Sequence, residues 1–248
     1  GLVGSEMCIR DSVFSQFLDD HKNGFTPNPD VLCNREIKFD VFQKYAKQIG
    51  ATKIASGHYA KIVKENDNFF ISKASDKTKD QSYFLYQLKS SLLHNIEFPL
   101  GSLLKKDIRK IAEENNLVNA SKKDSTGICF IGDRKYNDFV CQFLKTKKGK
   151  IITVDGEEIG YHDGHMYFTV GQRKGLGIGA RNSAFDKPWY VVNKDINKNI
   201  VYVAQGGTHP ALFSDQLLAD NMYWSRDISK LLPFKCNAKV RYRDEDHS

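Results

Sequence analysis

The chain has 248 residues, of which 40% are hydrophobic and 27% are charged. This length can bury a sizeable core, in one large domain or in two to three smaller ones. No apolar run approaches the roughly 18 residues that a membrane-spanning helix needs, so we expect a globular protein without a membrane partner. The five cysteines are widely spaced and form no CxxC pair, which argues against a disulfide scaffold or a metal site and favours a reducing, cytoplasmic location.

The charge balance does not by itself identify a binding partner. Lysine and arginine total 37 against 30 aspartate and glutamate, a net charge of +7. The basic residues gather at 105–110, 145–150 and 239–243. A basic surplus favours a polyanionic partner such as nucleic acid, but it also occurs in ordinary cytosolic proteins, so charge alone does not decide between them.

The N-terminal part of the chain alternates helix and strand patterns. Residues 1–12 lack the pattern of a signal or transit peptide, and we interpret them as a non-native leader before Val13. Apolar residues that recur every four positions predict a helix over 36–49, capped by Gly50. A short buried strand is predicted over 52–56, and it leads into Gly57 and His58. Ligands bind at such strand ends in α/β folds.

The segments after residue 60 predict a hairpin and short helices, and the pattern after Lys150 changes from mixed to β-rich. We expect a hairpin over 61–74, helices over 82–88 and 105–115, and an apolar helical stripe from 136 to 144. After Lys150 the pattern becomes β-rich, with runs at 151–154, 166–170, 189–192 and 200–203 between turns. A further β module is expected from Leu212 to the end, where it stops after a few strands.

Together these patterns predict an α/β fold followed by all-β structure. The predicted domains are a partial adenine-nucleotide domain over 13–144, a small central β domain over 145–207, and an incomplete C-terminal β-barrel over 208–248.

Two cysteines lie in segments whose residues suggest a chemical role. Cys33 follows two prolines and is predicted to precede a helix, whose N-terminal dipole would stabilise a thiolate. Asp30, three residues earlier, suits a general acid or base, or equally a helix cap. Cys129 lies in a polar loop between glycines, as an exposed sulfur carrier would, although its Ile and Phe neighbours also suit a core residue. Cys141 and Cys236 have no comparable setting, and we assign them no chemistry.

The glycine-rich segment 171–179 is basic, but it matches neither GxGxxG nor GxxxxGK[ST], so it is no Rossmann or Walker phosphate loop. A structural turn is its simplest interpretation, and a turn near an RNA backbone is the alternative.

Several segments, in this order along the chain, resemble the tRNA-specific 2-thiouridylase (MnmA) family. They are Thr26-Pro-Asn-Pro-Asp-Val-Leu-Cys-Asn34 with Ile37-Lys-Phe39, Gly57-His-Tyr-Ala60, Lys79-Asp-Gln-Ser-Tyr-Phe84, Asp124-Ser-Thr-Gly-Ile-Cys-Phe-Ile-Gly132, Gly171-Gln-Arg-Lys-Gly-Leu-Gly-Ile-Gly179 and Arg241-Tyr-Arg243. The resemblance covers essentially Val13 to the C-terminus. It implies a Rossmann-like nucleotide domain of PP-loop type followed by two β domains.

The resemblance also implies roles for individual residues. Cys33 would be the catalytic nucleophile and Cys129 the persulfide carrier, with Asp30 beside them. The target base would be contacted by Asn28, Pro29 and Asp30, ATP by Gly57, and the remaining tRNA by His58, Lys79, Asp80, Gln81, Arg241 and Tyr242.

The implied reaction exchanges the C2 oxygen of a wobble uridine for sulfur. ATP, with Mg as its counter-ion, would activate the oxygen as a leaving group, and the Cys129 persulfide would supply sulfur that Cys33 helps to release. A Cys33–Cys129 disulfide would result. A cysteine desulfurase or a sulfur-relay protein would load the persulfide.

One departure from the family pattern affects the expected activity. The Ser-Gly-Gly-x-Asp-Ser phosphate cradle of the family does not occur in the 248 residues. We therefore expect a chain truncated at its N-terminus, and at its C-terminus too, that does not thiolate by itself. The alternatives are a non-catalytic tRNA-binding fragment, and a thiol-dependent hydrolase or peroxidase that uses Cys33 with His58.

Overall fold

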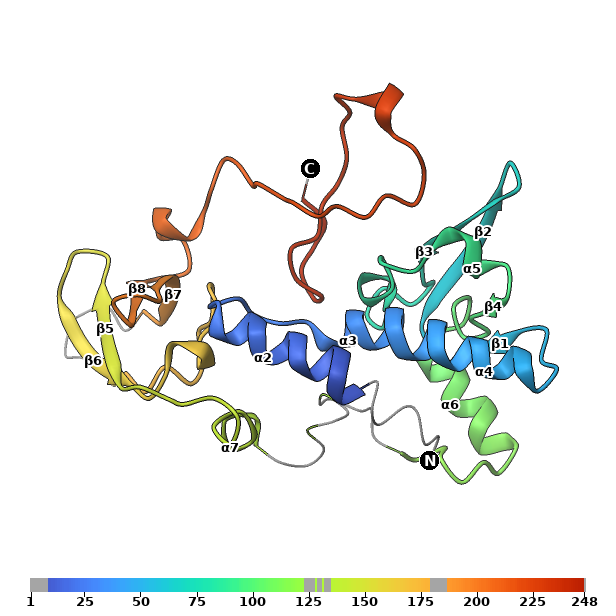
Figure 1. Ribbon diagram of the computed structural model, residues 1–248, viewed down its shortest axis with the longest axis horizontal. Helices are drawn as coiled ribbons and strands as arrows, with labels where there is room; N and C mark the ends of the chain where they lie inside the picture. Colours follow the sequence, from blue (N-terminus) through green and yellow to red (C-terminus); the bar gives the residue numbers. More distant parts are fainter. Residues whose placement is uncertain (1–8, 123–127, 129–130, 132–134, 179–186, 248) are drawn as a thin grey trace. The chain divides into compact units, whose positions relative to one another are not determined.

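The computed structural model describes residues 9–122, 128, 131, 135–178 and 187–247 (Figure 1). The chain divides into two compact units. Unit 1 comprises residues 1–13, 29–126 and 221–248, and unit 2 comprises residues 14–28 and 127–220. A π-helical turn, η1 (Ile9–Phe14), ends at the start of unit 2.

The second segment of unit 1 begins at Pro29 with one long helical run. It consists of α3 (Pro29–Leu32), the π-helical η2 (Cys33–Val41) and α4 (Phe42–Gln48). Proline is favoured at the first helical position, since its missing N–H would have no partner there. The run ends at Gly50, whose positive φ of 90° a glycine adopts without strain. The predicted helix over 36–49 is confirmed, and it starts earlier than expected.

The π-helical stretch changes which side of this helix is buried. Ile37, Phe39 and Ala46 lie in the interior, whereas Tyr45 and Ile49 of the predicted stripe are exposed. A π-helix has hydrogen bonds from i to i+5, so each of its turns holds more residues than an α-helical turn. The spacing of four in the sequence therefore does not continue as one buried face.

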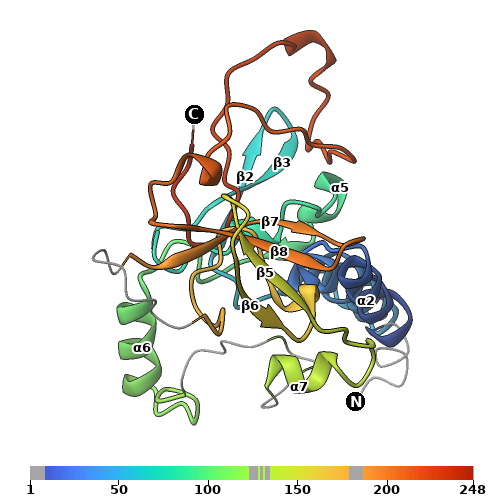
Figure 2. The ribbon, with the colours of Figure 1, turned by 90° about the vertical axis from the view of Figure 1, so that its left-hand side faces the viewer.

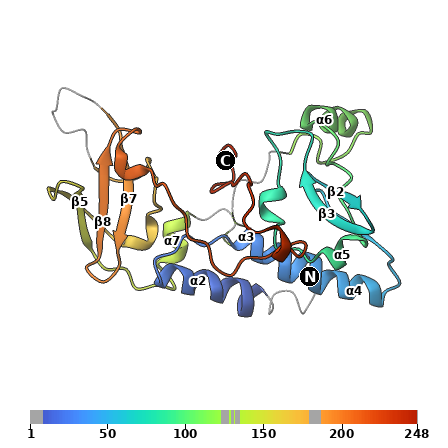
Figure 3. The same cartoon turned by 90° about the horizontal axis from the view of Figure 1, so that it is seen from above.

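Short strands follow this helix. β1 (Ile54–Ala55) pairs in parallel with β4 (Ile96–Glu97), which confirms the predicted strand over 52–56. β2 (Ala60–Glu65) and β3 (Asn68–Lys73) form an antiparallel hairpin, also as predicted. Its turn residues Asn66 and Asp67 have φ of 46° and 64°, the conformation of a two-residue turn of type I′. Figure 3 shows α5 (Ser90–Leu93) beside this hairpin.

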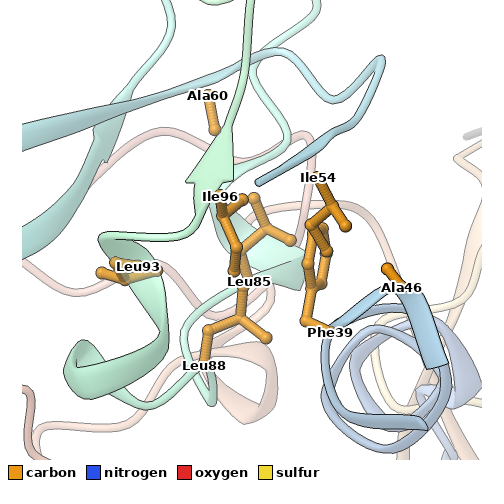
Figure 4. Packing of buried hydrophobic residues seen from close by; sticks show 8 residues of the cluster. All are labelled: Phe39, Ala46, Ile54, Ala60, Leu85, Leu88, Leu93 and Ile96. Atoms are coloured by element: carbon orange, nitrogen blue, oxygen red, sulfur yellow. The ribbon is translucent and has the colours of Figure 1, made fainter. Parts of the chain in front are cut away.

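The core of unit 1 lies where this helix, the short parallel pair and the hairpin meet. Figure 4 shows its buried side chains, which are Phe39, Ala46, Ile54, Ala60, Leu85, Leu88, Leu93 and Ile96. α6 (Lys105–Glu114) confirms the predicted helix over 105–115 and buries none of its residues.

Two expectations for unit 1 are wrong. The helix predicted over 82–88 is only a 3-10 turn, η3 (Ser82–Phe84), because the Asp80 carboxylate accepts hydrogen bonds from Ser82 and orders a turn there. The strands expected after Leu212 are absent from residues 212–247, which contain a 3-10 turn, η6 (Ser229–Leu231), and one isolated bridge between Ala238 and His247. A strand needs a continuous run of paired residues, and within residues 212–247 this bridge is the only pairing that the structure describes.

Unit 2 is built around a four-stranded sheet with the order β6-β5-β8-β7 (Figure 2). The strands are β5 (Gly149–Thr153), β6 (Glu158–His162), β7 (Trp189–Asp195) and β8 (Ile200–Gln205). β5 and β8 are parallel, and the other pairs are antiparallel. The predicted strands at 151–154, 189–192 and 200–203 are confirmed.

Smaller elements complete unit 2. They are α2 (Ser15–Lys22), α7 (Tyr136–Val140), η4 (His165–Tyr167) and η5 (Pro210–Leu212). The run predicted as strand over 166–170 instead begins in η4, and the side chain of Gln172 closes a turn onto the amide of Thr169. One buried cluster packs on the sheet (Ile151, Ile159, Phe168, Leu176, Val191, Val201 and Val203), and another joins α2 to α7 (Phe17, Ile131, Phe139, Val140 and Leu144).

Candidate active site

Cys33 lies one turn inside the helical run and not before it. α3 begins at Pro29, so Cys33 is the first residue of η2 and is 8% exposed. The expectation that the cysteine precedes a helix is therefore wrong, because the proline itself begins the helix. Asp30 lies three residues earlier, and residues three apart in a helix share one face. The backbone thus places Asp30 and Cys33 on one face of the helical run.

The environment of Asp30 shifts the pKa of its carboxyl group upward. Burial raises the pKa of this carboxyl above its usual range, and the charge of Lys38 opposes the rise. A carboxyl group with a raised pKa can hold a proton and deliver it to a nearby atom. The role of Asp30 as a general acid or base stays a prediction.

His58 lies in an aromatic setting after β1. Its ring contacts Phe39 and Phe98, with centroid distances of 5.7 and 5.9 Å, and its Nδ1 lies 2.6 Å from the Ser56 Oγ. Burial, and secondarily the charge of Lys38, lowers the pKa of His58 to about 4. The imidazole is therefore neutral near pH 7.

Lys38 is a residue that the sequence interpretation missed. Its charge acts on both Asp30 and His58, and the ring of the next residue, Phe39, contacts His58. Its place between Ile37 and Phe39 is the only signal in the sequence that could have found it. A second missed residue is Asn34, which is 2% exposed and donates through Nδ2 to the Phe84 carbonyl at 3.0 Å.

Hydrogen bonds join the strand-end segment to the Lys79–Gln81 loop. The amide of Gln81 donates to the Tyr59 carbonyl at 2.7 Å, and the Tyr59 amide donates back to Gln81 Oε1 at 3.0 Å. Asp80 is buried and accepts from the Ala74 amide at 2.8 Å and from the Ser82 hydroxyl at 2.8 Å. Asp80 therefore shapes the loop, and Gln81 holds it against the residue after His58.

The C-terminal residues of the predicted site lie beside the same loop. Tyr242 packs on Phe84 with a centroid distance of 4.4 Å, and the charges of Asp80 and Lys79 both act on its hydroxyl. Arg241 acts electrostatically on Tyr83, whose hydroxyl donates to the Val240 carbonyl at 3.1 Å. A cavity of 410 Å³ opens here, lined by Lys73, Asp80, Ser82, Tyr83, Asn237, Lys239 and Asp246.

For the remaining predicted site residues, the structure gives a position in the fold but few contacts. Gly57 is exposed directly after β1, where ligands bind in parallel α/β sheets, so this position is compatible with a nucleotide. Pro29 is buried in unit 1, whereas Asn28 is the last residue of a segment of unit 2. Cys129 lies outside the described residues, so its pairing with Cys33 stays a prediction. Among the residues that the structure describes, no group of three His, Cys, Asp or Glu could hold a metal ion.

Comparisons with known proteins identify the family. Residues 4–133 match a tRNA methyl transferase HUP domain, and residues 137–205 match a tRNA methyl transferase PRC-barrel domain. A tRNA-specific 2-thiouridylase of Geobacillus kaustophilus is 52% identical over 95% of this chain. Those of Hahella chejuensis and Stutzerimonas stutzeri are 50% identical over 95% and 96% of it. The chain belongs to the MnmA family of tRNA-specific 2-thiouridylases.

Membership in the MnmA family confirms the predicted fold class, a Rossmann-like α/β domain followed by β structure. The chain spans 63 to 65% of the length of these relatives. In the part of the chain that the structure describes, the sheet of unit 2 is open and does not close into a barrel. No described helix is long and apolar enough to cross a membrane.

Proposed function

We propose that this chain is part of an enzyme for the ATP-dependent 2-thiolation of the wobble uridine of tRNA, with sulfur carried as a cysteine persulfide. The observation that carries the proposal is the identity of 50 to 52% to tRNA-specific 2-thiouridylases over nearly the whole chain. The contact between Phe39 and His58 in unit 1 supports it, because these residues come from two of the motifs on which the resemblance rests.

The two cysteines divide the sulfur chemistry between them. Gly57 would contact ATP, which with Mg as its counter-ion would supply the adenylyl group that makes the C2 oxygen of the uridine a leaving group. The terminal sulfur of the Cys129 persulfide then attacks C2, and the activated oxygen leaves. The Cys33 thiolate attacks the Cys129 Sγ, which forms a Cys33–Cys129 disulfide and releases 2-thiouridine as its thiolate. An external thiol reductant restores both cysteines, and a cysteine desulfurase or relay protein reloads the persulfide in the cytoplasm.

The other residues bind and position the substrates. Asp30 has a raised pKa and transfers the proton at the target base, beside Asn28 and Pro29. His58 contacts the tRNA as a neutral ring, through stacking or a single hydrogen bond, because its lowered pKa removes its charge. Lys79 and Arg241 contact phosphates, and Asp80, Gln81 and Tyr242 shape that surface.

The two alternatives are weaker. In a Cys–His hydrolase, the thiolate would stabilise an imidazolium and raise the histidine pKa, whereas the pKa of His58 is lowered to about 4. A tRNA-binding fragment without catalysis would use the same basic residues. The thiolation assay below separates it from the enzyme.

The test is 2-thiouridine formation with ATP, a persulfide donor and unmodified tRNA. The chain is compared with a form extended by the segment of a relative that carries the Ser-Gly-Gly-x-Asp-Ser phosphate cradle, and we expect thiolation only from the extended form. In that form Cys33→Ser and Cys129→Ser should abolish turnover, and Cys141→Ser, at an exposed cysteine, is the matched control. Full activity of Cys33→Ser would refute the proposed division of roles. An extended form that binds tRNA but never thiolates it would favour the fragment.

A further inference from the structure

Unit 2 contains a cavity of 410 Å³ that the proposed thiolation does not use. Its described walls are the loop 173–178, residues 187–189 at the start of β7, and Gln205 at the end of β8. All of these residues belong to unit 2. Its volume lies in the range of small-ligand sites, so we asked which ligand these walls suit.

The basic loop of this cavity is joined to the sheet of unit 2. The Gln172 side chain accepts a hydrogen bond from the Thr169 amide at 2.9 Å and donates one to the Lys174 carbonyl at 2.9 Å. The amide of Gly171 donates to the Val191 carbonyl at 2.6 Å, and the Val191 amide donates to the Gln172 carbonyl at 3.0 Å. These bonds fix the backbone from which the side chains of residues 173 and 174 extend.

Another wall of the cavity carries an aromatic ring. Trp189 pairs with Gln205 across β7 and β8, and its half-buried side chain packs on the hydrophobic cluster of the sheet. Gln205 donates through Nε2 to the Lys187 carbonyl at 3.0 Å, and the Gly206 amide donates to the Pro188 carbonyl at 2.9 Å. The strand pairing therefore holds the residue that carries the indole at the cavity.

The charged residues of the described walls are all basic. They are Arg173, Lys174 and Lys187, and no described residue of the walls is acidic. Arg173 and Lys174 are exposed, and their side chains form no hydrogen bond or ion pair with any residue that the structure describes. Like charges at one cavity repel each other, and a bound anion offsets that repulsion.

We propose that this cavity binds one unstacked nucleotide, with its base on the Trp189 ring and its phosphate on Arg173 and Lys174. Proteins bind unpaired nucleotides by combining aromatic rings, on which bases stack, with basic side chains that contact phosphates. An acidic peptide would use the cations alone, so the indole favours a nucleotide. The cations also repel a metal ion.

The nucleotide is either part of an RNA chain or free in solution. The site goes beyond the proposed thiolation, because no residue of its walls has a role in that reaction. It develops one of the two interpretations of the glycine-rich segment 171–179, a turn close to RNA.

The experiment uses the fluorescence of Trp189 in the full chain. The chain has two tryptophans, and Trp224→Phe in unit 1 leaves Trp189 as the only one. The probe is oligouridylate of about five nucleotides, titrated at constant ionic strength. We expect saturable quenching, because a base that stacks on the indole changes its emission. Absence of quenching would overturn the site.

Charge variants test the phosphate contacts in this background. Arg173→Gln and Lys174→Gln should each weaken oligouridylate binding by about fivefold at about 50 mM salt. Lys198→Gln removes the same charge from an exposed lysine in the turn 196–199, at the other end of β7 and β8, and should keep the affinity. Unchanged affinity in both Arg173→Gln and Lys174→Gln would also overturn the site.

A ring variant tests the stacking contact. Trp189→Leu should weaken the binding of a fluorescein-labelled oligouridylate, measured by anisotropy, by about tenfold. Thermal unfolding checks that the variant folds. If it does not, Trp189→Phe replaces it, and its smaller ring should weaken binding less than loss of the ring would. Equal affinity in wild type and the ring variant that folds would contradict stacking on Trp189.

A second titration identifies the source of the nucleotide. Quenching by oligouridylate, but not by uridine 5′-monophosphate, would assign the site to an RNA chain. Equal affinity for the two probes would assign it to a free nucleotide. Both outcomes retain the site, and neither depends on thiolation activity.

Discussion

Asp80 shows how one buried side chain can organise a binding loop. Its carboxylate accepts hydrogen bonds from the Ala74 amide and the Ser82 hydroxyl while it is only 8% exposed. Asp80→Ala would leave these donors without a partner, and we expect a loss of about 1.5–3 kcal/mol in the free energy of unfolding. Asp80→Asn keeps one acceptor oxygen and should lose less. Urea denaturation measures both, with Glu113→Ala on the exposed side of α6 as the control.

His58 predicts a dependence of stability on pH. The pKa of His58 is about 4 in the folded chain, and its ordinary value of 6.5 applies to the unfolded chain. Between pH 4 and pH 6.5 the unfolded state therefore binds more protons than the folded state. Stability therefore falls as pH drops below 6.5, by up to about 1.4 kcal/mol per pH unit for this group. His58→Gln should flatten the dependence, and His94→Gln, at an exposed histidine, should leave it unchanged. Urea midpoints between pH 4.5 and 7.5 decide this, and an unchanged slope in His58→Gln contradicts it.

The packing of elements in unit 1 requires one close backbone contact. Gly101 lies after β4 and faces the first residue of β2, and a β-carbon there would lie 1.8 Å from the Ala60 carbonyl oxygen. The clashing atom belongs to the backbone of Ala60 and not to a flexible side chain, so it cannot rotate away from the added β-carbon. Gly101→Ala should destabilise the chain by more than about 2 kcal/mol, as measured by thermal or urea unfolding. Gly160→Ala in β6, where a β-carbon meets nothing within 4 Å, is the control and should change little.

The charge of the whole molecule predicts its response to salt. With a net charge of +7, the chain should bind tRNA through phosphate contacts that weaken as salt rises. Lys79→Ala and Arg241→Ala should each reduce the slope of log affinity against log salt by about one unit. Lys47→Ala, at the exposed end of α4, serves as the control. If both variants keep the wild-type slope, these residues do not contact phosphate.

Local patterns were sufficient for some elements of the fold. The hairpin over 61–74 was predicted because Asn66 and Asp67 tolerate the positive φ that a tight turn requires. The helix over 36–49 and three strands of unit 2, β5, β7 and β8, follow from periodicity and from Gly50 as a cap, whereas β6 was not predicted. The order of these elements, together with the motifs, was enough to indicate the family that the comparisons then showed.

Other features depend on partners distant in the sequence, and only the tertiary structure decided them. Phe39 contacts His58 because a helix and a strand end meet, which no local spacing encodes. His21 and Tyr136 are far apart along the chain, yet packing buries His21 and brings its Nε2 to 2.5 Å from the Tyr136 hydroxyl. Residue identity and short-range geometry thus determined the elements and the family, while burial, which depends on contacts across the chain, decided which side chains can act together.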